Sequence, residues 1–205
     1  VGKVGEIVGY ADTANGMVAF SDSTGLTDDE GDGISASTSI GDMTLAVAYV
    51  WDGGGTANVD GATTTSQSVS LSMPVGAGSL TIANASDDAS GVNMNETGVA
   101  YSMPLAGGTF ALGFTGTDGD TASLEGESMS AKYATTLGGA SVTLGYTGHD
   151  VNSKTGAETN VIVSSSLGGG ASIFAEIASR SGNSAAAATA TTDRTVVAVG
   201  TSVSF

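Results

Sequence analysis

Residues 194–205 read Arg-Thr-Val-Val-Ala-Val-Gly-Thr-Ser-Val-Ser-Phe and alternate between two kinds of side chain. The residues in step with Phe205 are apolar or β-branched, namely Val203, Thr201, Val199, Val197 and Thr195. The residues of the other parity are mostly small or polar, from Ser204 through Gly200 to Arg194. Because successive side chains of a β-strand point to opposite faces, this segment predicts a strand with one face suited to hydrocarbon and one suited to water.

The same alternation recurs along the chain in a unit made of a strand, a short Gly-rich turn and a second strand. The unit recurs at intervals of roughly 30 residues. A repeat of this kind decides which secondary structure each of its segments is assigned. Its copies are residues 69–82, 99–112, 131–144 and 161–175, with a tighter copy at 34–47. Glycine supplies the positive φ angles that tight hairpins need, so each copy predicts a β-hairpin.

Longer polar segments separate the hairpins, at residues 52–60, 87–95, 117–126, 149–158 and 179–193. Short turns at one end and long polar loops at the other are typical of bacterial outer-membrane barrels. A soluble sandwich buries its apolar face against a second sheet and exposes its polar face. The polar face of these strands is too small and too uncharged for a solvated surface, and it fits a channel better.

We therefore predict an all-β protein, a transmembrane antiparallel β-barrel that occupies residues 1–205 as a single domain. Eleven strands are expected between about residue 34 and Phe205. A barrel in lipid has no open edges, and bacterial single-chain barrels have even strand numbers. Either a further strand lies within residues 1–32, at 6–10 or 16–20, or strands precede Val1. The second alternative is favoured.

The charge balance narrows the function classes. The chain has 21 acidic and 5 basic residues, a net charge of -16, and no cysteine. Nucleic-acid binding depends on Lys and Arg side chains that meet phosphates, so this composition argues against it. Disulfides and thiolate metal sites are excluded. An excess of fixed negative charge favours cations as partners.

The C-terminal region resembles the general diffusion porins of the alphaproteobacterial, Rhodobacter-like family. The likeness lies in Leu167-Gly-Gly-Gly-Ala-Ser-Ile173, the loop that follows and the closing strand. Near the start, Gly5-Glu-Ile-Val-Gly-Tyr-Ala-Asp12 is similar to the inward-folded third loop of these porins. The resemblance implies that the strands are the last eleven of a sixteen-stranded barrel. It also implies a homotrimer in the outer-membrane lipid that passes small hydrophilic solutes and ions, with Phe205 as the assembly signal.

On the same resemblance, residues 1–32 form an acidic, inward-folded constriction region and residues 33–205 form the barrel strands. The constriction residues are Glu6, Asp12, Asp22, Asp28, Asp29, Glu30 and Asp32. The basic cluster that family porins place opposite this loop is nearly absent, because the only basic residues are Lys3, Lys132, Lys154, Arg180 and Arg194. We expect a weak preference for cations.

Lys132 and Glu176 have the parity of the polar face, so both are expected to line the pore, where water tolerates charge. They would tune ion selectivity, or they have no special role. No resident cofactor is expected. Asp28–Asp32 and Asp118–Asp120 carry oxygen ligands that would suit Ca²⁺, although a solvated acidic loop is the favoured interpretation of both segments.

His149 is expected in an external loop beside Asp150, with no nucleophile at a fitting distance. We therefore predict no catalytic residue and a protein that is not an enzyme. The predicted function is passive diffusion through an outer-membrane porin. The alternative is a secreted or surface β-rich adhesin or fibre subunit with acidic, Ca²⁺-binding loops.

Overall fold

The computed structural model describes residues 2–4, 31–53, 64–89, 92–120, 125–151, 154–182 and 193–203, and all regular structure in that part of the chain is β-strand. The strands are β1 (Gly2–Val4), β2 (Gly31–Ile40), β3 (Met43–Gly53), β4 (Thr64–Val75), β5 (Gly78–Ala89), β6 (Val92–Leu105), β7 (Gly108–Gly119), β8 (Gly126–Leu137), β9 (Ala140–Val151), β10 (Lys154–Gly168), β11 (Ala171–Gly182) and β12 (Arg194–Val203). Within the described ranges, no helix is long and apolar enough to cross a membrane.

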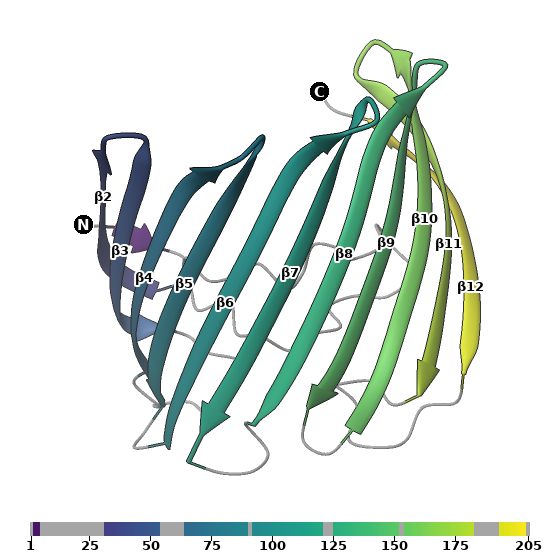
Figure 1. The fold of residues 1–205 in the computed structure, drawn as a ribbon. Coiled ribbons are helices and arrows are strands. Elements are labelled where there is room, and N and C mark those ends of the chain that lie inside the picture. The colour runs from purple at the N-terminus through teal and green to yellow at the C-terminus, as the bar shows by residue number, and fades with distance from the viewer. Residues whose placement is uncertain are drawn as a thin grey trace.

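All of these strands form one 12-stranded sheet in which spatial order follows sequence order from β1 to β12. Every neighbouring pair is antiparallel, as in β2 with β3 and β11 with β12. Figure 1 shows a single curved sheet of tilted strands, with β2 near one edge and β12 at the other. The two-residue hairpin turns after β2, β4, β6, β8 and β10 lie at one end of the strands, and the longer connections after β3, β7 and β11 join strands at the opposite end. The connections after β5 and β9 are also at that end but have only two residues each, so the predicted segregation of loop lengths holds only in part.

The eleven predicted strands correspond to β2–β12, and the three-residue β1 is an addition that pairs with the start of β2. The candidate strands at 6–10 and 16–20 lie outside the described residues. Several loop assignments are wrong. Residues 87–89 belong to β5 and residues 92–95 to β6, and β9 and β10 likewise extend into the segment 149–158. Polar residues continue these strands because the backbone ladder, and not side-chain hydropathy, sets their length.

The two faces of the sheet differ as the alternation predicted. Large apolar side chains are exposed on the outer face, among them Val47, Tyr49, Ile82, Leu112, Phe114, Leu144, Tyr146, Ile173, Ile177, Val197 and Val199. The alternate residues of the same strands, such as Ala48, Ala83, Thr115 and Thr147, are buried on the inner face. The sheet therefore has an apolar outside and an inside of small and polar side chains, which suits a barrel in lipid.

The alternative of a β-sandwich is wrong for the part of the chain that the structure describes. A sandwich core would enclose the large apolar side chains between two sheets. The buried apolar residues of this part are small or isolated, namely Ala48, Val50, Ala83, Ala85, Ile162 and Ala178. Burial of apolar side chains against one another thus contributes little to this fold.

Strand length fits the thickness of a membrane. Strand β7 has 12 residues, which span about 40 Å at a rise of about 3.4 Å per residue. At a tilt of about 40° the strand covers roughly 30 Å along the membrane normal. On its outer face Phe110, Leu112 and Phe114 are followed by Gly116 and the exposed Asp118, so the apolar band lies nearer the short turns.

Tyrosine side chains tie the short turns to the neighbouring hairpins. The hydroxyl of Tyr101 donates to the carbonyl oxygen of Val75 at 3.1 Å, and that of Tyr133 donates to the carbonyl oxygen of Ala106 at 3.1 Å. Each ring lies over a glycine, because a Cβ atom on Gly78 would meet Tyr101 and one on Gly108 would meet Tyr133. Rings with a polar tip are typical of the headgroup level of a membrane.

The turn between β6 and β7 contains a strained residue. Ala106 has φ 48° and Gly107 has φ 79°, so both central positions have the positive φ of a type I′ turn. Within the described residues, Ala106 is the single non-glycine with positive φ. Glycine adopts this conformation without a Cβ penalty.

We predict that Ala106→Gly raises the free energy of unfolding by about 0.5–1 kcal/mol, because it removes the Cβ penalty. Urea unfolding of the protein folded into lipid vesicles would measure the change. Gly107→Ala is the matched control and should have the opposite sign. Equal destabilisation by both substitutions would contradict the strain at Ala106.

An arginine substituted into β9 should destabilise the protein by different amounts on the two faces of the strand. Leu144 is 45% exposed on the outer face and its neighbour Thr143 lies on the inner face. Leu144→Arg should lower the free energy of unfolding in vesicles by about 2–4 kcal/mol, because lipid would surround the guanidinium. Thr143→Arg should cost clearly less. A larger loss for Thr143→Arg would mean that the faces are assigned the wrong way round.

Candidate pore-lining wall

The inward-facing side chains of β4–β12 form a surface that we call the inner wall. Its half nearer the long connections is buried, at Ser66, Ser68, Ser70, Asp87, Glu96, Thr115, Ser128, Ser130, Thr147, His149, Glu158 and Asn160. Its half nearer the short turns is only half-buried, at Ser72, Thr81, Ala100, Ser102, Ala111, Lys132, Ala134 and Thr143. The wall is therefore more open towards the short turns.

An ion pair lies on this wall at the β10–β11 boundary. Glu158 and Arg180 face each other in register, and the guanidinium of Arg180 donates to a carboxylate oxygen of Glu158. Both side chains are about nine-tenths buried, with 10% and 11% exposed. Arg194 of β12 is the next residue in the same row, beside Arg180. This row brings two of the five basic residues of the chain onto one part of the wall.

The two charges predicted to line the pore both face inward. Lys132 lies between the small residues Ala111 and Gly145 and is half-buried. Glu176 lies between Ile162 and Ala198 and is 1% exposed. The expectation that water surrounds Glu176 is therefore wrong. Parity gives the direction of a side chain but not what covers it.

His149 is not in an external loop, and that prediction is corrected. It lies in β9, in register with Ser128 of β8 and Gly156 of β10, and its side chain is 4% exposed on the inner wall. Its neighbours Asp150 and Gly148 have the opposite parity. Strand β9 continues beyond its apolar residues, whereas hydropathy alone predicts a loop where the apolar residues end.

Most of the predicted constriction lies outside the described residues, namely Glu6, Asp12, Asp22, Asp28, Asp29 and Glu30, and so does Phe205. Asp32 is placed, but in β2 and not in a loop, in register with Lys3 of β1. The barrel strands thus begin slightly before the predicted boundary at residue 33. The pore roles of these acidic residues stay predictions.

Asp118 and Asp120 do not form a cation site with a third acidic group. One carboxylate oxygen of Asp120 accepts hydrogen bonds from the backbone N–H of Asn93 at 2.8 Å and from its side-chain amide at 3.0 Å, which closes the end of β6 against β7. Across the described ranges, no three His, Asp or Glu side chains come together in a way that could hold a metal ion.

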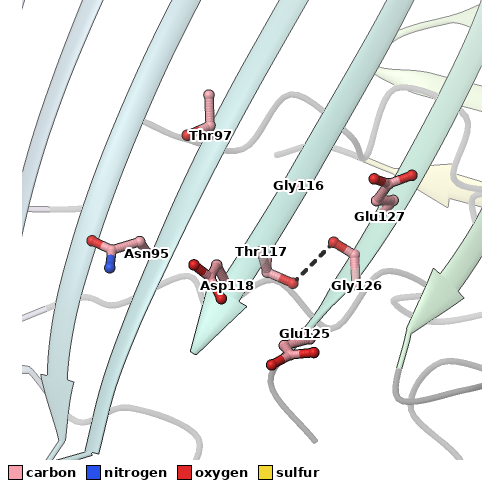
Figure 2. A pocket seen from close by; sticks show the side chains of 8 residues that line it. All are labelled: Asn95, Thr97, Gly116, Thr117, Asp118, Glu125, Gly126 and Glu127. Carbon is pink, nitrogen blue, oxygen red and sulfur yellow. Dashed lines mark hydrogen bonds between the residues drawn. The ribbon is translucent and has the colours of Figure 1, made fainter. Parts of the chain in front are cut away.

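A polar pocket of about 530 Å³ lies at the long-connection end of β6–β8. Figure 2 shows Asn95, Thr97, Asp118, Glu125 and Glu127 around it, together with the hydrogen bond from the Thr117 hydroxyl to the carbonyl oxygen of Gly126 at 3.3 Å. Thr97, Asp118 and Glu127 have the parity of the outer face, so most of this pocket is not part of the inner wall. It marks the point where the apolar band ends.

Comparison with known proteins agrees with this architecture. No protein-family model matches the chain, and no curated protein matches it by sequence. Among solved structures it is similar to OmpT, an outer membrane protein of Vibrio cholerae. The loop L8 deletion mutant aligns with a TM-score of 0.71 and 12% identity over 98% of this chain and 73% of that one. An in-vitro folded OmpT in trimer form gives a TM-score of 0.66 and 11% identity over the same shares.

At this identity the likeness shows the fold alone. The chain has the fold of an outer-membrane β-barrel protein, in which the strands form one antiparallel sheet. The predicted all-β barrel class is confirmed. At the level of the fold, the predicted location in a bacterial outer membrane is confirmed too, because the neighbours are outer-membrane proteins.

The comparison with OmpT overturns the prediction that the chain is not an enzyme. That prediction relied on His149 lying in an external loop with no nucleophile at a fitting spacing. The neighbours are described as outer-membrane proteins, and their shared fold gives no ground to exclude catalysis. His149 is also buried in the wall beside Ser128. The prediction that the chain is not an enzyme is therefore withdrawn.

Sequence reasoning missed several inward charges, namely Asp87, Glu96, Glu158 and Arg180. Asp87, Glu158 and Arg180 lie in segments that hydropathy assigned to loops, and Glu96 directly follows one of them. The signal was nevertheless present: Asp87 is in step with Ala83 and Ala85, which are buried on the inner face. Extending the alternation past the last apolar residue would have found it.

We predict that Glu158→Gln lowers the free energy of unfolding by about 1–3 kcal/mol, because it removes the carboxylate partner of the largely buried Arg180. Glu127→Gln on the exposed outer face is the matched control and should have little effect. Chemical denaturation in the same vesicles would compare them. Equal effects of the two substitutions would mean that the ion pair stabilises nothing.

Proposed function

We propose that the chain acts as an outer-membrane porin that lets small hydrophilic solutes and ions diffuse across the membrane, with a preference for cations. The observation that carries this proposal is the contrast between the faces of the sheet. The outer face exposes large apolar side chains, whereas the inner wall carries Ser, Thr and Gly with a few charges. Small polar side chains leave space and hydrogen-bonding groups for water along a pore.

The open half of the inner wall, near the short turns, would serve as the wider part of the channel. The covered half would serve as the narrower part, and it contains the charged row at Glu158 and Arg180. The acidic constriction inferred from the family resemblance, Glu6 to Asp32, belongs to the same proposal. We also propose that the chain is a Rhodobacter-like porin and that it forms a homotrimer. The likeness to an OmpT structure in trimer form supports the homotrimer.

Conductance in planar lipid bilayers tests the proposal directly. The folded protein should produce stepwise increases in current at low voltage, and vesicles that contain it should swell in isotonic solutions of small sugars. Folding has to be checked in the same sample by the shift of the unheated barrel on gel electrophoresis. Folded protein that produces neither current steps nor swelling would overturn the porin function.

The ion preference has its own test. Under a KCl gradient, the reversal potential should have the sign of K⁺ permeation, because the chain carries a net charge of -16. Lys132→Glu should raise the ratio of cation to anion permeability roughly 2-fold, since Lys132 lies in the open half of the wall. Glu127→Gln on the outer surface should leave it unchanged. A clear anion preference of the unaltered protein would refute the cation preference.

A further inference from the structure

The outer face of β6–β8 has a hollow where the apolar band ends, and this hollow is the polar pocket of about 530 Å³. Gly116 of β7 lies at its centre, because the register places this glycine directly between Thr97 of β6 and Glu127 of β8. One row nearer the long connections, Asn95 is paired with Asp118. These residues share the parity of the outer face, so the hollow opens towards the surroundings of the barrel. We call it the Gly116 hollow.

The protein's own side chains leave the space over Gly116 open. Tyrosine rings lie over other glycines of the outer face, namely Gly78, Gly108 and Gly148. A ring of this kind covers backbone that a glycine leaves bare. A Cβ atom added to Gly116 would meet, among the described residues, only the Cε1 atom of Phe114, at 3.8 Å. The Gly116 hollow therefore has room for a ligand.

The lining of the hollow has two chemically different sides, which Figure 2 shows. On the β6 side, Asn95 carries an amide and Thr97 carries a hydroxyl. The Thr97 oxygen accepts a hydrogen bond from the side-chain amide of Asn84 at 3.0 Å, so its own O–H group can donate. The β7–β8 side carries three carboxylates, those of Asp118, Glu125 and Glu127. One side thus offers N–H and O–H donors, and the other offers negatively charged acceptors.

The surroundings of the hollow define the rest of the ligand. The sequence of β5–β9 contains one Lys or Arg, namely Lys132, and it faces the inner wall, so it does not balance the carboxylate side. The next row towards the short turns is apolar, with Phe114 paired to Val99 on one side and to Met129 on the other. All three of these side chains are exposed on the outer face. A fitting ligand therefore has a cationic end and an apolar part that lies along this row.

We propose that the Gly116 hollow binds one membrane lipid whose headgroup carries a phosphate and a primary ammonium group, as phosphatidylethanolamine does. The ammonium group donates N–H hydrogen bonds to the carboxylate side. The phosphate accepts hydrogen bonds from Asn95 and Thr97, and the acyl chains lie over Phe114. A quaternary ammonium has no N–H group, so a choline lipid fits less well. The proposal rests on the outer-membrane barrel fold and does not require that the barrel conduct ions.

Native mass spectrometry of the detergent-folded protein tests this proposal. The protein is mixed with equal amounts of phosphatidylethanolamine, phosphatidylcholine and phosphatidylglycerol that have the same acyl chains. One phosphatidylethanolamine per chain should be retained, at roughly 5-fold the level of either other lipid. Gly116→Leu fills the hollow and should lower this retention about 5-fold or more. Thr159→Leu adds a leucine to the exposed outer face of β10 and is the matched control, which should retain the lipid as the unaltered protein does.

A second variant separates charge from shape. Asp118→Asn removes one exposed carboxylate and should lower the preference for phosphatidylethanolamine over phosphatidylcholine about 2-fold. It also takes the place of Gly116→Leu if that variant does not fold. Equal retention of the three lipids, or a preference for phosphatidylglycerol, would overturn the proposal. Unchanged phosphatidylethanolamine retention by the folded variants would place the lipid elsewhere on the barrel and would overturn it too. Bilayer currents do not enter this test, so its outcome is independent of the porin function.

Discussion

The structure depends on one constraint: every backbone N–H and C=O group within hydrocarbon needs a hydrogen-bond partner from the protein. Between β2 and β12 the sheet satisfies this with antiparallel ladders between each pair of consecutive strands, with register shifts at Trp51/Gly53 and Ser166/Gly168. The strands do not stop where their apolar residues stop. They run on through Asp87, His149 and Glu158 because the ladder continues, and this continuation places the charges of the inner wall.

The same ladders explain why the protein needs so little apolar core. A soluble domain is stabilised by large side chains packed against one another. Here Leu112, Leu144 and Val199 face outward, and the inner face is filled with alanine, serine and threonine. Lipid takes the place of the core as the apolar medium, and small inward residues leave the concave side free for polar groups and charge.

The inner wall is not uniformly exposed to solvent, and this changes how its charges act. Lys132 lies in the open half, where water screens it, whereas Glu158, Glu176 and Glu96 are largely buried. Buried charges require partners. Arg180 is the partner of Glu158, whereas neither carboxylate oxygen of Glu96 has a hydrogen-bond partner among the described residues.

The sequence by itself determined the fold class, the hairpin repeat and the direction of each strand residue, because alternation with a period of two is a local property of the backbone. It also determined where the turns lie, since Gly41, Gly107 and Gly139 adopt the positive φ that those turns need. Strand length, and hence the position of His149, was decided only by pairing with the neighbouring strands. The meeting of Glu158 with Arg180 was decided by the register between separate strands. Register is a long-range property that no single segment encodes.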